Sequence, residues 1–225
     1  MHYGDVKKAV FLSRPNRFIA HVSLDGVDTV VHVKNTGRCA ELLVPGVTVY
    51  LEKGTNPGRK TAYDLIAVEK GTRLVNMDAQ APNRAFAEFA RTFDPTASVV
   101  RQEVRYGESR LDFCLETPTG LHYIEVKGVT LEHDGHVFFP DAPTQRGTRH
   151  LRELMRAVEE GHRATVFFVV QMADVLDFRP HDGHDPDFGQ TLRQAAEHGV
   201  NVAAYECQVT PDSMKINREV PVILR

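Results

Sequence analysis

The chain has 225 residues, of which 42% are hydrophobic and 25% are charged, and its formal net charge is −3 at pH 7. These values are typical of a soluble globular protein with one large domain or two modest ones. No stretch approaches the roughly 20 apolar residues of a membrane-spanning helix, and the N-terminal segment lacks the apolar core of a signal peptide, so we expect a cytoplasmic protein without membrane contacts.

The charge is divided unevenly along the chain. Residues 1–81 carry 11 Lys and Arg against 8 Asp and Glu, a net charge of +3, whereas residues 82–225 carry 16 against 22, a net charge of −6. A mildly basic module beside an acidic one suits a polyanion-binding domain followed by a metal-binding domain. The three cysteines, Cys39, Cys114 and Cys207, are odd in number and widely spaced, so we expect reduced, buried side chains rather than disulfides or a zinc site.

From Arg17 to Asp78 the sequence consists of short alternating segments separated by turn residues, without a helical pattern. The alternating segments are residues 18–24, 29–33, 47–52, 64–69 and 74–77. Five short strands in succession predict a small closed barrel of the oligonucleotide-binding (OB) type, although an SH3-like barrel would give the same pattern. We therefore assign residues 1–81 to an OB-fold-like, nucleic-acid-binding β-barrel.

The rest of the chain alternates between helical and strand patterns. Pro82 begins a helical stretch with Phe86, Phe89 and Phe93 at helical spacing. Further elements are predicted as strands over 98–105, 110–116 and 121–126, a helix over 149–159, a buried strand over 164–170, a helix over 188–198 and a strand from 202. The order αβββαβ predicts a mixed α/β domain over residues 82–225.

Asp112, Glu125 and Lys127 lie on the second and third strands predicted for this domain. The turn residues 117–120 fold the two strands into a hairpin, and a pivot in the middle of the turn places Asp112 directly across from Glu125. Opposed side chains have Cβ atoms roughly 5 Å apart. Two carboxylates that close repel each other unless a positive group lies between them. A divalent metal ion is the simplest such group, and Lys127 follows on the same face.

This element order and the spacing Asp-x12-Glu-x-Lys resemble the restriction-endonuclease-like nuclease core called PD-(D/E)XK, with Leu111 in place of the namesake proline. In such enzymes the carboxylates hold Mg²⁺, and the lysine helps to position or deprotonate the attacking water. Mg²⁺ binds through one or two carboxylates together with substrate phosphate and water, and it lowers the pKa of the bound water. Some resolvase-like members add an acid from the first helix, where Glu88 stands. The resemblance implies Asp112, Glu125 and Lys127 as catalytic residues, and Asp112, Glu125 and Glu88 as ligands of Mg²⁺ or Mn²⁺.

The whole chain, from about residue 14 to 224, resembles the sugar fermentation stimulation protein A family. The stretches that carry this resemblance are Arg17-Phe18, Asn35-Thr36-Gly37-Arg38, Asn56-Pro57, Arg59-Lys60-Thr61, Tyr63, Pro82-Asn83, Arg110-Leu111-Asp112-Phe113, Glu125-Val126-Lys127, Phe139-Pro140-Asp141-Ala142, Arg146-Gly147 and His150-Leu151-Arg152-Glu153-Leu154. The resemblance implies a bacterial or archaeal protein with an OB-type barrel and a nuclease-like C-terminal domain. It also implies binding of double- or single-stranded DNA with little sequence preference, and a regulatory link to sugar utilisation.

Basic side chains at predicted strand ends and loops supply candidate DNA contacts. On the barrel they are Arg14, Arg17, Lys34, Arg38, Arg59 and Lys60, where such a barrel would hold a nucleic-acid backbone. Arg146 and His150, at the entrance of the helix after the three catalytic candidates, are further candidates because helix N-termini favour anions. Phe18 is one of few aromatic residues available for base stacking, and we expect it to face the core.

Three functions remain open from the sequence. The first is a metal-dependent nuclease that binds DNA and uses Asp112, Glu125 and Lys127. The second is a non-catalytic DNA-binding regulatory protein, and the third is a metal-dependent hydrolase of a small phosphate ester. The presence of all three candidate residues favours the first over the second, and salt-sensitive duplex binding would separate both from the third.

Overall fold

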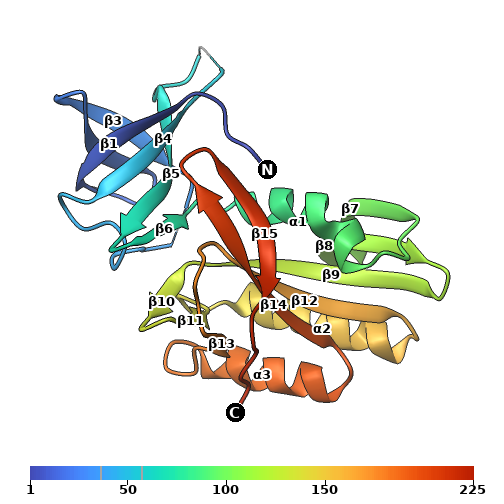
Figure 1. Ribbon diagram of the computed structural model, residues 1–225. Helices are drawn as coiled ribbons and strands as arrows, with labels where there is room; N and C mark the ends of the chain where they lie inside the picture. Colours follow the sequence, from blue (N-terminus) through green and yellow to red (C-terminus); the bar gives the residue numbers. More distant parts are fainter. Residues whose placement is uncertain (36, 57) are drawn as a thin grey trace.

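The computed structural model of the protein describes residues 1–35, 37–56 and 58–225 (Figure 1). Thr36 and Pro57, which belong to two of the family-like stretches, lie outside the described residues. The N-terminal strands are β1 (Val6–Ser13), β2 (Ile19–Leu24), β3 (Val27–Val33), β4 (Thr48–Lys53), β5 (Tyr63–Lys70) and β6 (Arg73–Asn76). They are followed by α1 (Ala81–Phe93), β7 (Val99–Tyr106), β8 (Ser109–Thr117), β9 (Gly120–Val129), β10 (Leu131–His133), β11 (His136–Phe139), α2 (Gln145–Glu159), β12 (Arg163–Val170), β13 (Asp177–Pro180), α3 (Pro186–Glu197), β14 (Asn201–Thr210) and β15 (Ser213–Glu219).

The N-terminal strands form a closed barrel whose alternating apolar residues share one interior. The strand order is β3-β2-β1-β4-β5-β6, and a parallel pairing of β3 with β5, in which His32 lies opposite Asp64, closes β1 to β5 into the barrel. Phe11, Val22 and Leu51 from three of these strands are at most 1% exposed. The prediction of a five-stranded closed barrel is confirmed.

The barrel uses a strand that the sequence pattern did not reveal. β1 begins with two exposed lysines and buries only Ala9 and Phe11, so its alternation is weak. The predicted strand over 74–77 corresponds to β6, which pairs with β5 alone and leads out of the barrel toward the second domain.

The C-terminal domain is a six-stranded mixed sheet, β15-β14-β12-β9-β8-β7, with helices on both faces. In Figure 1 α1 covers one face, whereas α2 and α3 cover the other. On the first face the ring centroid of Phe86 lies 4.8 Å from those of both Phe113 and Phe167. On the second face Leu154 of α2 and Leu192 of α3 are fully buried. The predicted elements of this domain are present with bounds shifted by a few residues.

Five strands of the C-terminal half were not predicted as separate elements or were predicted only in part. β10, β11 and β13 form a small three-stranded sheet, and β15 pairs with β14 at the edge of the main sheet. The predicted strand from residue 202 is the first part of β14, which runs to Thr210. β10, β11 and β13 have only three or four residues each, which is too short for a periodic pattern to stand out.

A buried polar network joins the two domains at the end of β12. The side-chain amide of Gln171, which is 2% exposed, donates to the backbone and side-chain oxygens of Asn76 (both 3.0 Å) and to the backbone oxygen of Asp78 (3.1 Å). A second link lies further out, where Lys70 and Arg73 of the barrel both pair with the buried carboxylate of Glu132. Low-dielectric surroundings make such satisfied networks strong and their loss costly, so these contacts fix the barrel on the sheet.

Two further expectations concern cysteines and membranes. Cys39, Cys114 and Cys207 are buried and free, as predicted. Within residues 1–35, 37–56 and 58–225, none of the helices has the length and apolar character needed to cross a membrane.

The Gln171 network predicts a stability defect for a nearly isosteric apolar replacement. Gln171→Met leaves the acceptors on Asn76 and Asp78 buried without their donor, and should lower the free energy of unfolding by about 2–3 kcal/mol. Urea denaturation measures this change, with Gln194→Met on the exposed face of α3 as the matched control, expected within about 0.5 kcal/mol of wild type. Equal stability of the two variants would contradict a structural role for the network.

Candidate active site

The hairpin of β8 and β9 brings two acidic side chains together. Phe113 pairs with Ile124 and Cys114 with Tyr123, which is the predicted register, and one further step places Asp112 across from Glu125. The side chains of Phe113 and Ile124 enter the core under α1, so Asp112 and Glu125 point to the opposite face because strand side chains alternate. The backbone amide of Val126 donates to Asp112 Oδ2 at 2.8 Å, which fixes this carboxylate against β9.

Glu125 is 2% exposed and is held through one of its two oxygens. Its Oε1 accepts hydrogen bonds from Lys127 Nζ (2.5 Å) and from His150 Nδ1 on α2. Its Oε2 is buried and has no hydrogen-bond partner within the part of the chain that the structure describes. Burial raises the pKa of Glu125, but the hydrogen bond from His150 and the charge of Lys127 outweigh it, so the net pKa is lowered. Glu125 therefore stays ionised and presents one oxygen free for a ligand.

Asp112 has the opposite electrostatic balance. Burial raises the pKa of the Asp112 carboxyl, and the neighbouring Glu125 charge raises it further. Hydrogen bonds from the Val126 amide and from Asn83 of α1, whose Nδ2 lies 2.8 Å from Asp112 Oδ1, oppose this shift without cancelling it. The two acids thus have pKa values moved in opposite directions, which is common where carboxylates share a functional site.

The two carboxylates open into a cavity of about 500 Å³ between β7, β9, α1 and the start of α2. The residues that line it are Ala79, Gln80, Asn83, Glu103, Asp112, Glu125, Val126, Lys127, Thr144, Arg146 and Gly147. Thr144 caps α2 by accepting from the Gly147 amide, and the first turn of α2 contains no acidic residue. Since the first amides of a helix lack intrahelical partners, this end of α2 favours an anion in the cavity.

Asn83 and Glu103 are cavity residues that sequence reasoning missed. On β7, Gln102 pairs with Phe113 and Val104 with Leu111, so Glu103 lies across from Asp112 on the side away from Glu125. Three acids therefore follow one another across β7, β8 and β9. Glu103 has a left-handed backbone with φ of 56°, and its carboxylate is exposed and paired with Arg110 at 2.9 Å. The signal that could have found it is the same register argument, applied to the β7–β8 hairpin.

The donor set fits a hard divalent cation. Glu125 Oε2 is buried without a partner in the described part of the chain, and the neighbouring Asp112 carboxylate is penalised by burial, so both would gain from a cation between them. Within the described residues no group of three or more His, Cys, Asp or Glu side chains is arranged to hold a metal. Two carboxylates are nevertheless a sufficient protein contribution for Mg²⁺, which keeps several waters and takes substrate phosphate as a ligand.

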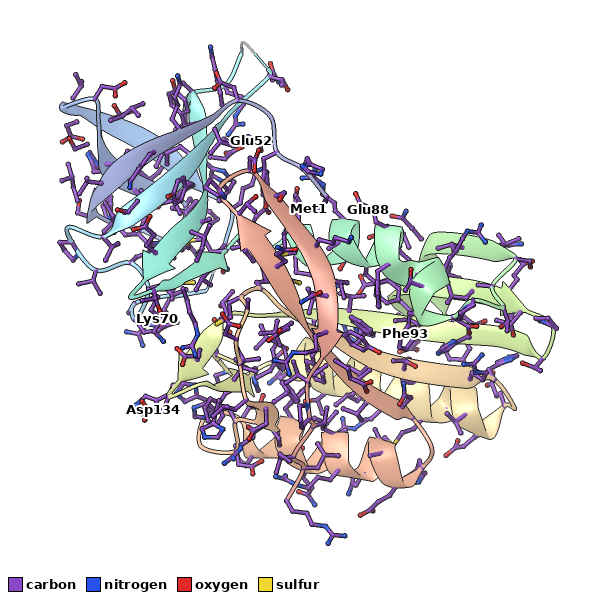
Figure 2. All side chains as sticks on the ribbon, in the orientation of Figure 1. Met1, Glu52, Lys70, Glu88, Phe93 and Asp134 are labelled. Carbon is purple, nitrogen blue, oxygen red and sulfur yellow. The ribbon has the colours of Figure 1, made fainter. Side chains whose placement is uncertain are left out.

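Glu88, predicted as a third metal ligand, lies elsewhere. It is exposed on α1, where its carboxylate contacts the Met1 amine at 2.7 Å (Figure 2), and it does not line the cavity. Five residues of an α-helix correspond to about 140° of rotation, so Glu88 and Asn83 leave α1 in different directions. Asn83 is the α1 residue that reaches the carboxylates.

Four of the eight residues predicted to contact DNA are engaged inside the protein. The Arg14 guanidinium donates to four backbone oxygens, among them those of Gly37 (2.9 Å) and Asn35 (2.7 Å), and so holds the loop after β3. Lys34 lies within 3.5 Å of the carboxylates of Glu52, Asp64 and Asp78, and Arg59 pairs with Asp64. His150 is 2% exposed and binds Glu125. His150 is buried, so its prediction as a surface contact is corrected to an internal one. Arg14, Lys34 and Arg59 are partly exposed, and their pairing with the protein's own oxygens was not revealed by their sequence positions; contact of these three with DNA stays a prediction.

The other four predicted DNA contacts, Arg17, Arg38, Lys60 and Arg146, are exposed. Arg17 and Arg38 line one hollow of about 670 Å³ on the barrel, and Arg146 lines the cavity of the two carboxylates. Phe18 is 47% exposed, with the Arg17 guanidinium carbon 5.0 Å from its ring centroid, so the expectation that it faces the core is wrong.

Comparisons with known proteins match the whole chain. Residues 12–77 match the family model described as SfsA N-terminal OB domain, and residues 80–213 match the model described as Sugar fermentation stimulation protein RE domain. The chain is 48% identical over 226 residues to the "Sugar fermentation stimulation protein homolog" of Clostridium beijerinckii, with 100% of both chains covered, and 48% identical over 225 residues to that of Desulfitobacterium hafniense, with 100% and 99% covered. A solved structure described as "The structure of Pyrococcus Furiosus SfsA in complex with Ca2+" has a TM-score of 0.88 and 28% identity, covering 99% of this chain and 98% of that one. The first match identifies the barrel as OB-type rather than SH3-like.

The raised pKa of Asp112 predicts that replacing its carboxylate with a neutral side chain stabilises the folded protein. An acid whose pKa is raised on folding opposes folding when it is ionised, so its cost is absent below its ordinary pKa of about 4 and grows as the pH rises. Asp112→Asn should therefore raise the thermal midpoint near neutral pH and have no such effect below about pH 4. Asn83 can rotate its amide to accept from the new side chain, which preserves the contact.

Differential scanning calorimetry at both pH values measures this difference. Asp5→Asn, an exposed acid before β1, is the matched control and should leave the midpoint unchanged at either pH. A loss of stability of Asp112→Asn that is equal at both pH values would show that burial of the charge is not the dominant effect.

Proposed function

The chain belongs to the sugar fermentation stimulation protein family, and we propose that it binds DNA with little sequence preference and hydrolyses phosphodiester bonds with the help of Mg²⁺ or Mn²⁺. The observation that carries this proposal is the buried pair of Asp112 and Glu125, with one Glu125 oxygen unpartnered and Lys127 beside it, opening into a cavity at the start of α2. Family membership supports a DNA-binding, nuclease-like protein at the level of the family. The arrangement of the residues supports the more specific reaction.

A divalent cation is supported by two independent features. The carboxylate oxygens of Asp112 and Glu125 are hard ligands, and the structurally similar protein from Pyrococcus furiosus is described as a complex with Ca2+, which also prefers oxygen ligands. When bound, Mg²⁺ or Mn²⁺ would polarise the phosphoryl oxygen and lower the pKa of a bound water. Asp112 and Glu125 are the residues that would hold it.

The chain's own residues account for the remaining tasks. His150 contacts Glu125 Oε1 through its Nδ1 atom, and Arg146 Nε lies 3.4 Å from the other ring nitrogen, His150 Nε2. Because Arg146 can only donate, the His150 proton lies on Nδ1 and is directed at Glu125. This contact and the one from Lys127 leave Glu125 with a single orientation. Lys127 is 14% exposed, so its ammonium reaches the cavity, where it can orient the attacking water or contact the phosphate.

The start of α2 supplies the complementary anion site. The guanidinium of Arg146 is exposed in the same cavity, and the first turn of α2 contains no acidic residue, although the Thr144 amide before it donates to Asp185 Oδ2 at 2.7 Å. A phosphate placed there would face the carboxylates across the cavity and would be held by a helix N-terminus and a bidentate donor. The buried acids Asp112 and Glu125 would thus hold the cation, and the exposed Arg146 with the start of α2 would hold the phosphate of a phosphodiester.

The path from the barrel to this cavity favours a polymeric substrate over a small phosphate ester. The hollow that Arg17 and Arg38 line on the barrel shares Gly37 with a second cavity of about 350 Å³ at the domain junction, and that cavity shares Ala79 and Thr144 with the cavity of the carboxylates. Neighbouring hollows are therefore bordered by common residues. A small ester would need only the last of them, whereas a nucleic-acid strand can follow all three.

The catalytic part of the proposal predicts a dependence on two side chains and a metal. Purified wild-type protein should nick supercoiled DNA in the presence of Mg²⁺ or Mn²⁺ and not in EDTA. Asp112→Ala and Lys127→Ala should each reduce the rate at least about 100-fold, as removal of a catalytic proton-transfer or charge-stabilising group does. Gel electrophoresis of a time course measures the rates.

The matched control for this experiment is Lys215→Ala, an exposed lysine on β15 that should retain the wild-type rate. Equal nicking by all four proteins would assign the activity to a contaminant. Binding of DNA without nicking by any of them would instead establish the non-catalytic function, in which the nuclease-like domain contributes to DNA binding for a regulatory role linked to sugar metabolism.

The binding part of the proposal predicts a change in salt dependence. The double variant Arg17→Ala/Arg38→Ala removes two exposed charges from the barrel hollow. It should weaken DNA binding at low salt. It should also reduce the slope of log K against log salt by roughly one unit for each lost phosphate contact. Fluorescence anisotropy at several salt concentrations measures the slope. The control Lys7→Ala/Lys215→Ala removes two exposed charges that line none of the three hollows. An equal loss of slope in both double variants would show that binding follows net charge rather than this path.

A further inference from the structure

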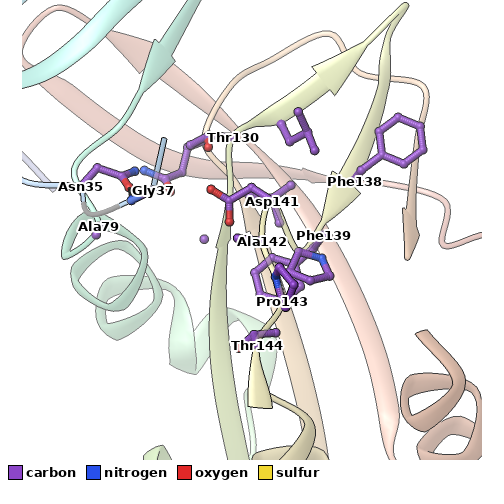
Figure 3. Close-up of a pocket in the computed structure, with 15 residues that line it drawn as sticks. Asn35, Gly37, Ala79, Thr130, Phe138, Phe139, Asp141, Ala142, Pro143 and Thr144 are labelled. Carbon is purple, nitrogen blue, oxygen red and sulfur yellow. Dashed lines mark hydrogen bonds between the residues drawn. The ribbon is translucent and has the colours of Figure 1, made fainter. Parts of the chain in front are cut away.

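The cavity at the domain junction has a composition different from both of its neighbours. It lies between the barrel loop that carries Asn35 and Gly37 and the segment after β11 (Figure 3). Its volume of about 350 Å³ is within the range of small-ligand sites, roughly 300–1,000 Å³. Its lining includes the stretch Phe139-Pro140-Asp141-Ala142, one of the family-like sequences to which the proposed hydrolysis gives no role.

Two oxygen acceptors, on Asp141 and Gln171, border this cavity beside the hydroxyl groups of Thr130 and Thr144. The Asp141 carboxylate is exposed, and in Figure 3 it points toward Gly37 and Asn35. The amide of Gln171 uses its nitrogen for the network at the domain junction, which leaves Oε1 at the cavity wall. A ligand in this space therefore meets oxygen acceptors and should carry N–H donors.

Two glycines keep the space open. A Cβ atom at Gly37 would lie 2.6 Å from Asp141 Oδ2, and one at Gly128 would lie 2.5 Å from Gln171 Oε1. Both distances are too short for atoms that are not bonded, so a side chain at either position would displace an acceptor group. The absence of side chains at these two positions is what allows Asp141 and Gln171 to border the cavity.

The apolar wall is rigid and aromatic. The Phe139 ring packs against Phe168 at 5.5 Å and Phe188 at 5.1 Å between centroids, which anchors the segment to the core of the C-terminal domain. Pro140 and Pro143 follow on the same wall. A flat ligand can pack against such a surface, as nucleobases do in protein pockets.

The charge of the cavity disfavours a phosphate inside it and favours a neutral base. Asp141 is the one ionisable group in the described lining, and a carboxylate repels a phosphate. The same carboxylate accepts well from the exocyclic amine of a base. Since the cavity shares Ala79 and Thr144 with the cavity of the two catalytic carboxylates, a base held here belongs to a nucleotide close to the reacting phosphate.

We propose that this junction cavity binds one unpaired nucleobase of the DNA, held through its N–H groups by Asp141 and Gln171 and packed against the wall formed by Phe139 and Pro140. The inference rests on the proposed DNA binding and adds to it a preference for DNA with unpaired nucleotides. A paired base has its N–H groups engaged with its partner, so only an unpaired or extruded nucleotide can enter. The protein should then prefer DNA with bulges, gaps or single-stranded segments over a continuous duplex.

The experiment compares three DNAs of the same sequence: a continuous duplex, a duplex with one bulged adenine, and a duplex with an abasic bulge. Fluorescence anisotropy in EDTA measures binding without cleavage. Wild type should bind the bulged adenine about tenfold more tightly than either of the other two DNAs. Asp141→Ala should reduce this ratio to about one. Loss of an acid strengthens binding to all three DNAs, so the readout is the ratio of affinities for bulged and continuous DNA. Asp187→Ala on α3 is the control for the change in net charge.

The outcomes separate this inference from the function on which it rests. A wild-type ratio near one, or a ratio that Asp141→Ala leaves unchanged, would overturn the base subsite while leaving DNA binding intact. Equal binding of the adenine and abasic bulges would also overturn it, because the preference would then be for bent DNA. Failure to bind any of the three DNAs would overturn the proposed function itself.

Discussion

Two carboxylates placed side by side in a largely buried position repel each other, and the surroundings of Asp112 and Glu125 are organised around that repulsion. Lys127 and His150 stabilise the ionised form of Glu125, whereas Asn83 and the Val126 amide hold Asp112 in place without removing its penalty. One oxygen of Glu125 still lacks a donor among the residues that the structure describes. A fold that retained this arrangement for stability alone would gain from replacing Asp112, the acid whose pKa is raised, with a neutral residue. The unfavourable balance at Asp112 is one that the proposed cation would relieve.

The position of the barrel is the second constraint, because it determines what lies beside these carboxylates. Gln171 and Asn76 lock β6 to the end of β12, and Glu132 binds Lys70 and Arg73 at the outer edge of the same junction. Together they place the loop after β3 opposite the segment that precedes α2. The junction cavity lies between these two segments, and Gln171 of the polar network is part of its lining.

The local pattern of the sequence was sufficient to predict the fold class and the hairpin, but not the partners of most charged residues. The register of β8 and β9 followed from a short turn and strict alternation, and both are local properties. The pairing of Lys34 with Asp78, 44 residues away, and that of His150 with Glu125, 25 residues away, depend on tertiary packing that no local pattern encodes. Glu88 illustrates the same limit, since the helix was predicted correctly while the direction of one side chain on it was not. β1 was missed because only two of its residues are buried.

The charges of the cavity are ordered from floor to rim, and this order has a consequence for binding. At the floor, Asp112 and Glu125 face one lysine, which leaves a net charge of −1 in the buried part. At the rim, Arg146 and the start of α2 are positive and exposed, and the exposed Glu103 carboxylate is paired with Arg110. The negative floor repels a phosphate as long as no cation neutralises it, whereas the rim attracts the same phosphate. Cation and DNA should therefore bind with positive coupling, each raising the affinity of the other by an equal factor, because linkage between two binding equilibria is reciprocal.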